Sequence, residues 1–318
     1  MPGAPAVVAV CLMGPTATGK TDLAMALADR LPLGLVSVDS AMVYRYLDIG
    51  SGKPAPDVLA RYPHRLVDIR DPWEQYSAGD FATDASQAIR DISASGRIPL
   101  LVGGTFLYFR SLVEGLADLP AADPALRAAL DARAAREGWP ALHAELARFD
   151  PAAAARIGAT DRQRIQRALE VRLLTGQPIS ALQGRPAAGE RGEFFRIGLL
   201  PRDRPALAER IALRLQRMLE RGFIGEVERL LSLPEMHADR TALRAVGYRQ
   251  IARFLVGRCT RAEAERQALA ATRQLAKRQL TWLRREECDL WLDVEADDLP
   301  GTLEQAVRGV LPRMQCQP

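Results

Sequence analysis

The chain has 318 residues, of which 48% are hydrophobic, and this is enough for one large α/β domain with a smaller insertion or second domain. No stretch has the apolar length of a membrane span, and the first residues lack the basic start and cleavage site of a secretory signal, so we expect a cytoplasmic protein without a membrane segment. The net charge is only +4, and the four cysteines and three histidines are scattered, which argues against a disulfide framework and a zinc site. Since no coiled-coil or interface pattern is visible, we expect a monomer.

Residues 14–21 match the phosphate-binding pattern G-x-x-x-x-G-K-[ST] at every fixed position. The segment reads Gly14, Pro15, Thr16, Ala17, Thr18, Gly19, Lys20 and Thr21. An apolar run typical of a buried parallel strand precedes it, and an amphipathic helical pattern follows it. Backbone N–H groups of such a loop bind phosphate, Lys20 adds a positive charge, and the Thr21 hydroxyl is placed to coordinate Mg²⁺. The sequence therefore predicts a phosphate site, without saying whether the phosphate belongs to a nucleotide.

Apolar runs that resemble strands recur along the chain. They lie at Ala6–Met13, Gly34–Val38, Arg65–Ile69, Ile98–Val102, Phe194–Leu200 and Asp289–Asp293. Helical patterns separate most of them, which predicts an α/β fold: a P-loop NTPase-like parallel sheet with helices on both faces. Ser77-Ala78-Gly79-Asp80 resembles a capping box that begins the helix ending near Ser95-Gly96.

Between Leu116 and Phe194 the strand pattern disappears and the sequence becomes alanine-rich and helical. We therefore expect residues 117–193 to form a helical insertion domain. It would separate a first core segment, 1–116, from a second one, 194–318.

Two further segments place polar residues at the carboxyl ends of predicted strands, where ligands of such sheets bind. Asp39-Ser40 follows the second strand, and Gly103-Gly104-Thr105 follows the strand at Ile98–Val102. The two glycines permit close backbone approach. From the residues alone, Asp39 either holds an Mg²⁺-bound water or acts as a general base, and Thr105 is either part of the site or only the N-cap of a helix.

A basic segment lies near the end of the chain. From Arg240 to Arg285 twelve lysines and arginines stand against two glutamates, a local charge of +10, so the remainder carries −6. At 100° per residue, polar and basic side chains occupy an arc of roughly 140° on the last long helix. These are Arg273, Gln274, Lys277, Arg278, Thr281, Arg284 and Arg285. Apolar residues fill the opposite side, namely Leu269, Leu275, Ala276, Leu280, Trp282 and Leu283, with Gln279 as the one polar exception. The pattern favours a polyanion partner over a merely solvated face.

Taken together, these segments resemble the bacterial tRNA dimethylallyltransferases, also called tRNA isopentenyltransferases. The resemblance rests on Gly14–Thr21, Val38-Asp39-Ser40…Tyr44, Asp48-Ile49-Gly50…Lys53-Pro54, His64-Arg65-Leu66…Asp68, Leu101–Tyr108, Arg244–Gln250 and Ala271–Arg284. It covers essentially the whole chain. Four positions depart from the family pattern: Met42 replaces a frequent Gln, Tyr46 replaces a usual Gly, and Ser51-Gly52 replaces a common Thr-Ala.

The resemblance implies a prenyltransferase that moves a dimethylallyl group from dimethylallyl diphosphate to the N6 amine of adenosine at position 37 of tRNA, in the anticodon stem-loop. It implies catalytic roles for Asp39, Lys20 and Thr105, diphosphate binding by Gly14–Thr21, and Mg²⁺ on Thr21. The residues that would then face tRNA are Asp39, Ser40, Ala41, Met42, Thr105, Arg127, Gln163, Arg164, Ile165, Gln166, Arg167, Arg244, Ala245, Val246, Gly247, Tyr248, Arg249, Lys277, Arg278, Gln279, Leu280, Thr281, Trp282, Leu283 and Arg284.

Two alternatives use the same features differently. A small-molecule or nucleotide kinase would hold ATP in the loop and cover it with an arginine-bearing lid. A non-catalytic RNA-binding module would keep its function when Asp39 is replaced with Ala.

Overall fold

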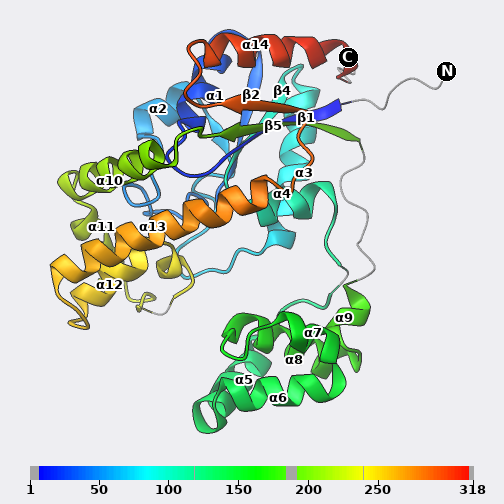
Figure 1. The fold of residues 1–318 in the computed structure, drawn as a ribbon, viewed down its shortest axis with the longest axis vertical. Helices are drawn as coiled ribbons and strands as arrows, with labels where there is room; N and C mark the ends of the chain where they lie inside the picture. The colour runs from blue at the N-terminus through cyan, green and yellow to red at the C-terminus, as the bar shows by residue number, and fades with distance from the viewer. Residues whose placement is uncertain (1–6, 118, 184–191, 239, 315–318) are drawn as a thin grey trace. The chain divides into compact units, whose positions relative to one another are not determined.

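The computed structural model describes residues 7–117, 119–183, 192–238 and 240–314 (Figure 1). The chain divides into two compact units, which we call the core unit, Met1–Leu112 with Arg191–Pro318, and the helical unit, Val113–Glu190. The predicted boundaries at 116/117 and 193/194 differ from these by a few residues. That the helical unit contacts tRNA stays a prediction.

A six-stranded sheet forms the centre of the core unit, and all its neighbouring strands run parallel. Its strands are β1 (Val7–Met13), β2 (Leu33–Val38), β3 (His64–Arg65), β4 (Ile98–Gly103), β5 (Glu193–Leu200) and β6 (Leu290–Asp293), in the order β3-β2-β4-β1-β5-β6. The predicted α/β class and parallel sheet are confirmed. Ala6, the predicted first residue of the first strand, lies outside the described residues.

One predicted strand is much shorter than expected. The prediction was Arg65–Ile69, whereas β3 ends at Arg65. Leu66 and Asp68 adopt positive φ angles of 65° and 56°, which interrupt the extended backbone. The other five predicted strands agree with the structure to within one residue at each described end.

Helices cover both faces of the sheet. The core unit contains α1 (Lys20–Ala28), α2 (Pro56–Arg61), α3 (Ala78–Ala94), α4 (Phe106–Val113), α10 (Arg204–Glu220), α11 (Phe223–Leu231), α12 (Tyr248–Leu255), α13 (Arg261–Leu283) and α14 (Leu299–Val310), with 3-10 turns at Ala242–Arg244 and Leu311–Arg313. Leu35 of β2 shares a hydrophobic cluster with Leu27 of α1 and Leu303 of α14. Gly34 points to the opposite face, where a Cβ on it would come within 2.5 Å of Ile92 in α3.

The predicted capping box at the start of α3 is confirmed. The Ser77 hydroxyl accepts a hydrogen bond from the Asp80 N–H at 3.1 Å, and the Asp80 carboxylate accepts one from the Ser77 N–H at 2.8 Å. Two donors at the N-terminus of the helix are thereby satisfied.

The helical unit has a hydrophobic core of its own. It contains α5 (Pro124–Glu137), α6 (Trp139–Phe149), α7 (Pro151–Arg156), α8 (Arg162–Thr175) and α9 (Ile179–Leu182), and residues 119–183 contain no strand. Leu130 of α5, Leu142 and Leu146 of α6, and Ile165 and Leu169 of α8 are buried together in one cluster. Prolines in the first turns of α5, α6 and α7 fit positions where no backbone donor is needed. Across the described parts of both units, no helix is long and apolar enough to cross a membrane.

Candidate active site

Three neighbouring strands end at the same level of the sheet. β4 lies between β2 and β1, and Gly103 at its end is aligned with Val38 on one side and Met13 on the other. Asp39, Gly104 and Gly14 follow these aligned residues directly, so the structure brings the three predicted polar segments together. A Cβ on Gly103 would lie 2.1 Å from the Val38 carbonyl oxygen, so only glycine fits this close approach.

Asp39 is held at this edge by the backbone that follows it. Its Oδ1 accepts hydrogen bonds from the N–H groups of Ala41 at 2.8 Å and Met42 at 3.2 Å. Thr105 Oγ1 accepts a hydrogen bond from the Ser40 N–H at 3.2 Å, which joins the turn after β4 to the turn after β2. Asp39 Oδ2 makes no hydrogen bond to any residue that the structure describes. One carboxylate oxygen therefore orients the side chain while the other can accept a proton.

Two cations meet at the phosphate loop. The Lys20 ammonium donates to the Pro15 carbonyl oxygen and to Thr18 Oγ1. Arg214 reaches the loop from α10 and donates to Thr16 Oγ1 at 3.1 Å and to the Ser51 carbonyl oxygen at 3.0 Å. Burial, reinforced by the nearby Arg214 guanidinium, lowers the pKa of Lys20 to about 7, while Asp39 opposes this shift. The loop thus carries positive charge that a bound anion would stabilise.

Arg214 was not among the predicted site residues. It lies 198 residues from Thr16 in the chain, so no local motif connects the two. One arginine among the 43 lysines and arginines has no distinguishing neighbours in the sequence.

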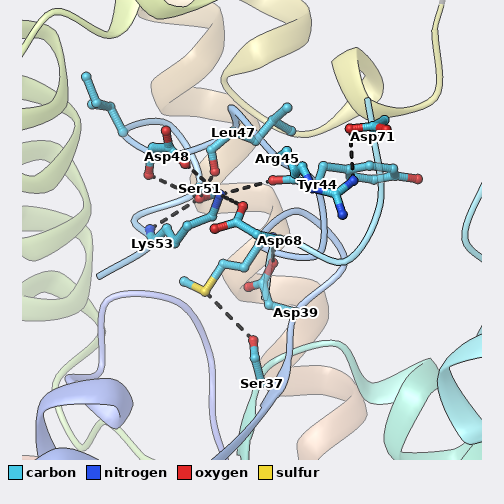
Figure 2. A network of polar contacts seen from close by, with 12 residues as sticks. Ser37, Asp39, Tyr44, Arg45, Leu47, Asp48, Ser51, Lys53, Asp68 and Asp71 are labelled. Atoms are coloured by element: carbon cyan, nitrogen blue, oxygen red, sulfur yellow. Dashed lines mark hydrogen bonds and ion pairs between the residues drawn. The ribbon is translucent and has the colours of Figure 1, made fainter. Parts of the chain in front are cut away.

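An ion-pair network around the buried Lys53 shapes the loop that follows Asp39 (Figure 2). The buried Lys53 ammonium lies 2.5 Å from carboxylate oxygens of both Asp48 and Asp68, and donates to the Tyr44 carbonyl oxygen at 3.0 Å. The Ser37 hydroxyl donates a long hydrogen bond to the Met42 sulfur at 3.9 Å. The family-like residues between Tyr44 and Asp68 therefore hold the loop together beside Asp39.

A second anchor for this loop comes from α11 and α12. The buried Glu226 carboxylate accepts hydrogen bonds from the N–H groups of Asp48 at 3.2 Å, Ile49 at 2.6 Å and Gly50 at 3.1 Å. The Tyr248 hydroxyl donates to Glu226 at 2.6 Å and accepts from the Ser51 N–H at 3.1 Å. Glu226 was not predicted, because all its partners in this turn are distant in the sequence.

The residues predicted to contact tRNA include both exposed and buried side chains. The exposed ones are Ser40, Gln163, Arg164, Arg244, Arg249, Lys277, Arg278, Thr281 and Arg284. Four other side chains are buried, with exposed fractions of 0% for Ile165, Tyr248 and Leu283 and 7% for Leu280, and the backbone of Gly247 is buried as well. A helix turns by about 100° per residue, so a continuous run of residues cannot keep one face toward a ligand. The predicted tRNA contact is therefore wrong for these four side chains, which pack in the interior of the protein.

In the helical unit, two arginines predicted to contact tRNA pair with a buried carboxylate. Arg127 donates to Glu170 at 2.8 and 3.0 Å, and Arg167 donates to it at 2.6 Å. Burial opposes ionisation of Glu170, but these hydrogen bonds outweigh it and lower its pKa. Both arginines therefore hold Glu170 in place, and their predicted contact with tRNA stays a prediction, since 30% and 28% of their side chains are exposed.

Comparison with known proteins identifies the family. A model described as IPP transferase matches residues 42–286, and one described as Isopentenyl transferase matches residues 7–68. The chain belongs to the IPP transferase family. The predicted family and fold class are thereby confirmed.

Relatives of this IPP transferase family member span nearly its whole length. It is 56% identical over 310 residues to a tRNA dimethylallyltransferase of Xanthomonas campestris pv. campestris, covering 95% of this chain and 94% of that protein. It is 54% identical over 307 residues to one of Stenotrophomonas maltophilia, covering 94% and 97%. The solved structure of a tRNA isopentenylpyrophosphate transferase from Bacillus halodurans superposes with a TM-score of 0.68 at 35% identity, covering 95% and 96%. These relatives favour a prenyltransferase over the kinase and the RNA-binding module.

Proposed function

We propose that this prenyltransferase transfers a dimethylallyl group from dimethylallyl diphosphate to the N6 amine of adenosine 37 in the anticodon stem-loop of tRNA, and releases diphosphate. The observation that carries the proposal is the alignment of three strand ends. It places Asp39 beside a phosphate loop that Lys20 and Arg214 make positive.

The diphosphate of the donor would occupy the phosphate loop. N–H groups in the first turn of α1 have no partner within the helix and are suited to bind phosphate oxygens. Lys20 and Arg214 would neutralise the charge that grows on the leaving diphosphate as the allylic C–O bond breaks. The electron pair of that bond leaves with the diphosphate.

The loop also suits a magnesium ion. The described residues contain no group of three or more His, Cys, Asp or Glu that could form an all-protein metal cage. Mg²⁺ commonly takes only one or two protein ligands and fills its shell with phosphate oxygens and water, which fits a single hydroxyl such as that of Thr21. When bound there, the ion would add charge neutralisation at the diphosphate.

Asp39 would act on the acceptor. The exocyclic amine of adenine is a weak nucleophile because its lone pair is delocalised into the ring. A carboxylate that accepts its proton as the new N–C bond forms makes the attack feasible. Asp39 Oδ1 is engaged by Ala41 and Met42, and Oδ2 would take the proton. Thr105 would hold Ser40 and thereby fix this turn.

The exposed face of α13 would contact the tRNA backbone. Arg273, Lys277 and Arg278 are exposed on it and Arg284 is exposed at its C-cap, while Ala276, Leu280 and Leu283 are buried. Cations on one face of a packed helix suit a row of phosphates. The target base would have to leave its stack to reach the donor beside Asp39.

Incubation of the purified chain with an unmodified anticodon stem-loop and dimethylallyl diphosphate tests the proposal. We expect one prenyl group on the adenosine, with Mg²⁺ required and no ATP consumed. Consumption of ATP with a small acceptor, without prenylated RNA, would support the kinase instead.

Asp39→Asn is the matched test of the base, because asparagine can still accept the two backbone hydrogen bonds. We expect kcat to fall by about 100-fold or more while the Kd for tRNA changes less than about 2-fold. Full turnover in this variant would remove Asp39 as the base.

A further inference from the structure

Gln279 is the polar residue on the apolar side of α13, and both ends of its amide are engaged. Its Oε1 accepts a hydrogen bond from the Thr16 N–H at 2.9 Å, and its Nε2 donates to the Gly104 carbonyl oxygen at 2.9 Å. The adjacent Leu280 and the preceding Ala276 are 7% and 2% exposed, so this side chain lies on the packed side of the helix. Its polarity therefore serves contacts inside the protein.

The two partners of Gln279 belong to the two halves of the site. Thr16 is part of the phosphate loop, and its hydroxyl accepts a hydrogen bond from Arg214. Gly104 directly precedes Thr105, whose hydroxyl holds the Ser40 N–H next to Asp39. One side chain thus connects the donor side of the site to the acceptor side.

The packing around this contact is close. A Cβ on Gly104 would lie 2.5 Å from Gln279 Nε2 and 2.9 Å from the Gly14 carbonyl oxygen. The turn at Gly104-Thr105 is therefore packed between the Gln279 amide and Gly14 at the start of the phosphate loop. The position of this turn depends on both neighbours.

We infer that Gln279 is a positioning residue for the transfer reaction. It fixes the phosphate loop relative to the Gly104-Thr105 turn, and through them the allylic carbon of the donor relative to the amine beside Asp39. The inference rests on the proposed function, which places the donor in the loop and the acceptor at Asp39. Reacting atoms must come within about 3–3.5 Å in the right direction, and a displacement of about 1 Å can cost about 100-fold in rate.

Gln279→Leu removes both hydrogen bonds and keeps a side chain of similar size. We expect kcat to fall by about 10- to 100-fold, while the KM values for donor and tRNA change less than about 3-fold, because Gln279 acts on alignment through Thr16 and Gly104. Gln267→Leu is the control: Gln267 is exposed on the same helix, away from the site residues, and its replacement should leave both parameters unchanged. Single-turnover rates at saturating enzyme exclude a simple loss of active protein.

Gln279→Glu provides a readout that a purely structural role would not move. Its carboxylate can accept from the Thr16 N–H but repels the Gly104 carbonyl oxygen, whereas its protonated form can donate to that oxygen again. Because only the protonated form can donate to the Gly104 carbonyl oxygen, the rate of this variant relative to the wild type at each pH should recover as the pH falls from 8 to 6. The ratio for Gln279→Leu should stay constant.

Three results separate the possible failures. If the wild-type protein prenylates no tRNA, the proposed function fails. If it does, and Gln279→Leu keeps kcat within about 2-fold or raises only the KM for the donor, the positioning role alone is overturned. A Gln279→Glu rate ratio that does not respond to pH also overturns it.

Discussion

Replacing Tyr248 with Phe tests whether this residue anchors the active-site loop or contacts tRNA. The substitution removes one oxygen atom and creates no large cavity. The hydroxyl donates to the buried Glu226 carboxylate at 2.6 Å and accepts from the Ser51 N–H at 3.1 Å, and Tyr248 itself is 0% exposed. The loss therefore affects two buried hydrogen bonds at once.

The magnitude follows from these two contacts. A hydrogen bond to a charged group contributes about 1.5–3 kcal/mol, and a buried N–H left without a partner costs about 1–3 kcal/mol. Because Glu226 keeps its three backbone donors, we expect the free energy of unfolding to fall by about 3 kcal/mol. For a unit of this size that lowers Tm by about 6–12 °C.

The assay is thermal unfolding followed by circular dichroism, together with the KM for tRNA in the transfer reaction. We expect the lower Tm with a KM for tRNA within about 2-fold of the wild type. Tyr62→Phe is the matched control, because the Tyr62 hydroxyl donates to Asp29 at 2.8 Å in an exposed position, where the loss should stay within about 0.5 kcal/mol. An unchanged Tm with a raised KM for tRNA would refute the anchor and restore Tyr248 as a tRNA contact.

Three further predictions concern separate parts of the molecule. Arg214→Met should lower kcat/KM for the donor by about 100-fold and leave the KM for tRNA nearly unchanged. A change in the KM for tRNA alone would contradict the proposed contact of Arg214 with the diphosphate. Replacing Arg273 and Lys277 with Ala together should weaken tRNA binding and reduce the slope of log K against log salt by about 1–2, whereas an unchanged slope would exclude this face as a phosphate contact. The folded state lowers the pKa of Glu170, so its stabilising effect is present above its ordinary value of 4.5 and is lost as the pH falls through the folded-state pKa. The Tm difference between the wild type and Glu170→Gln should therefore shrink on acidification from pH 6 to 3.5, and a constant difference would contradict the shift.

The sheet and its phosphate loop could be predicted because their determinants are local. The strand β1, the loop and α1 follow one another within residues 7–28, and each is encoded by its own run of apolar or glycine-containing sequence. The short β3 could not be predicted in the same way. Leu66 carries a side chain that normally disfavours a φ of 65°, and the pattern alone gives no reason for it to leave the strand conformation.

The anchor and the second cation of the site escaped prediction for a different reason. Glu226 contacts a turn about 177 positions away, and Arg214 contacts the loop 198 positions away. Such pairs form only after the sheet has brought their helices together. A resemblance to relatives marks the turn at Asp48–Gly50 and Tyr248 as characteristic, but it does not say that they belong to one buried network.

Helix periodicity and family resemblance made different predictions for α13, and the structure distinguishes them. The resemblance assigned the continuous run Lys277–Arg284 to tRNA, whereas the 100° period placed Leu280 and Leu283 on the packed side, where they are buried. Gln279 fits neither rule, because it is polar on the packed side. Gln279 is half-buried, and an amide withdrawn from water needs hydrogen-bond partners, so a polar residue on this apolar side indicates a specific internal contact. At this position the contact joins the phosphate loop to the turn that holds Asp39, so the one departure from the pattern marks a residue that connects the two halves of the site.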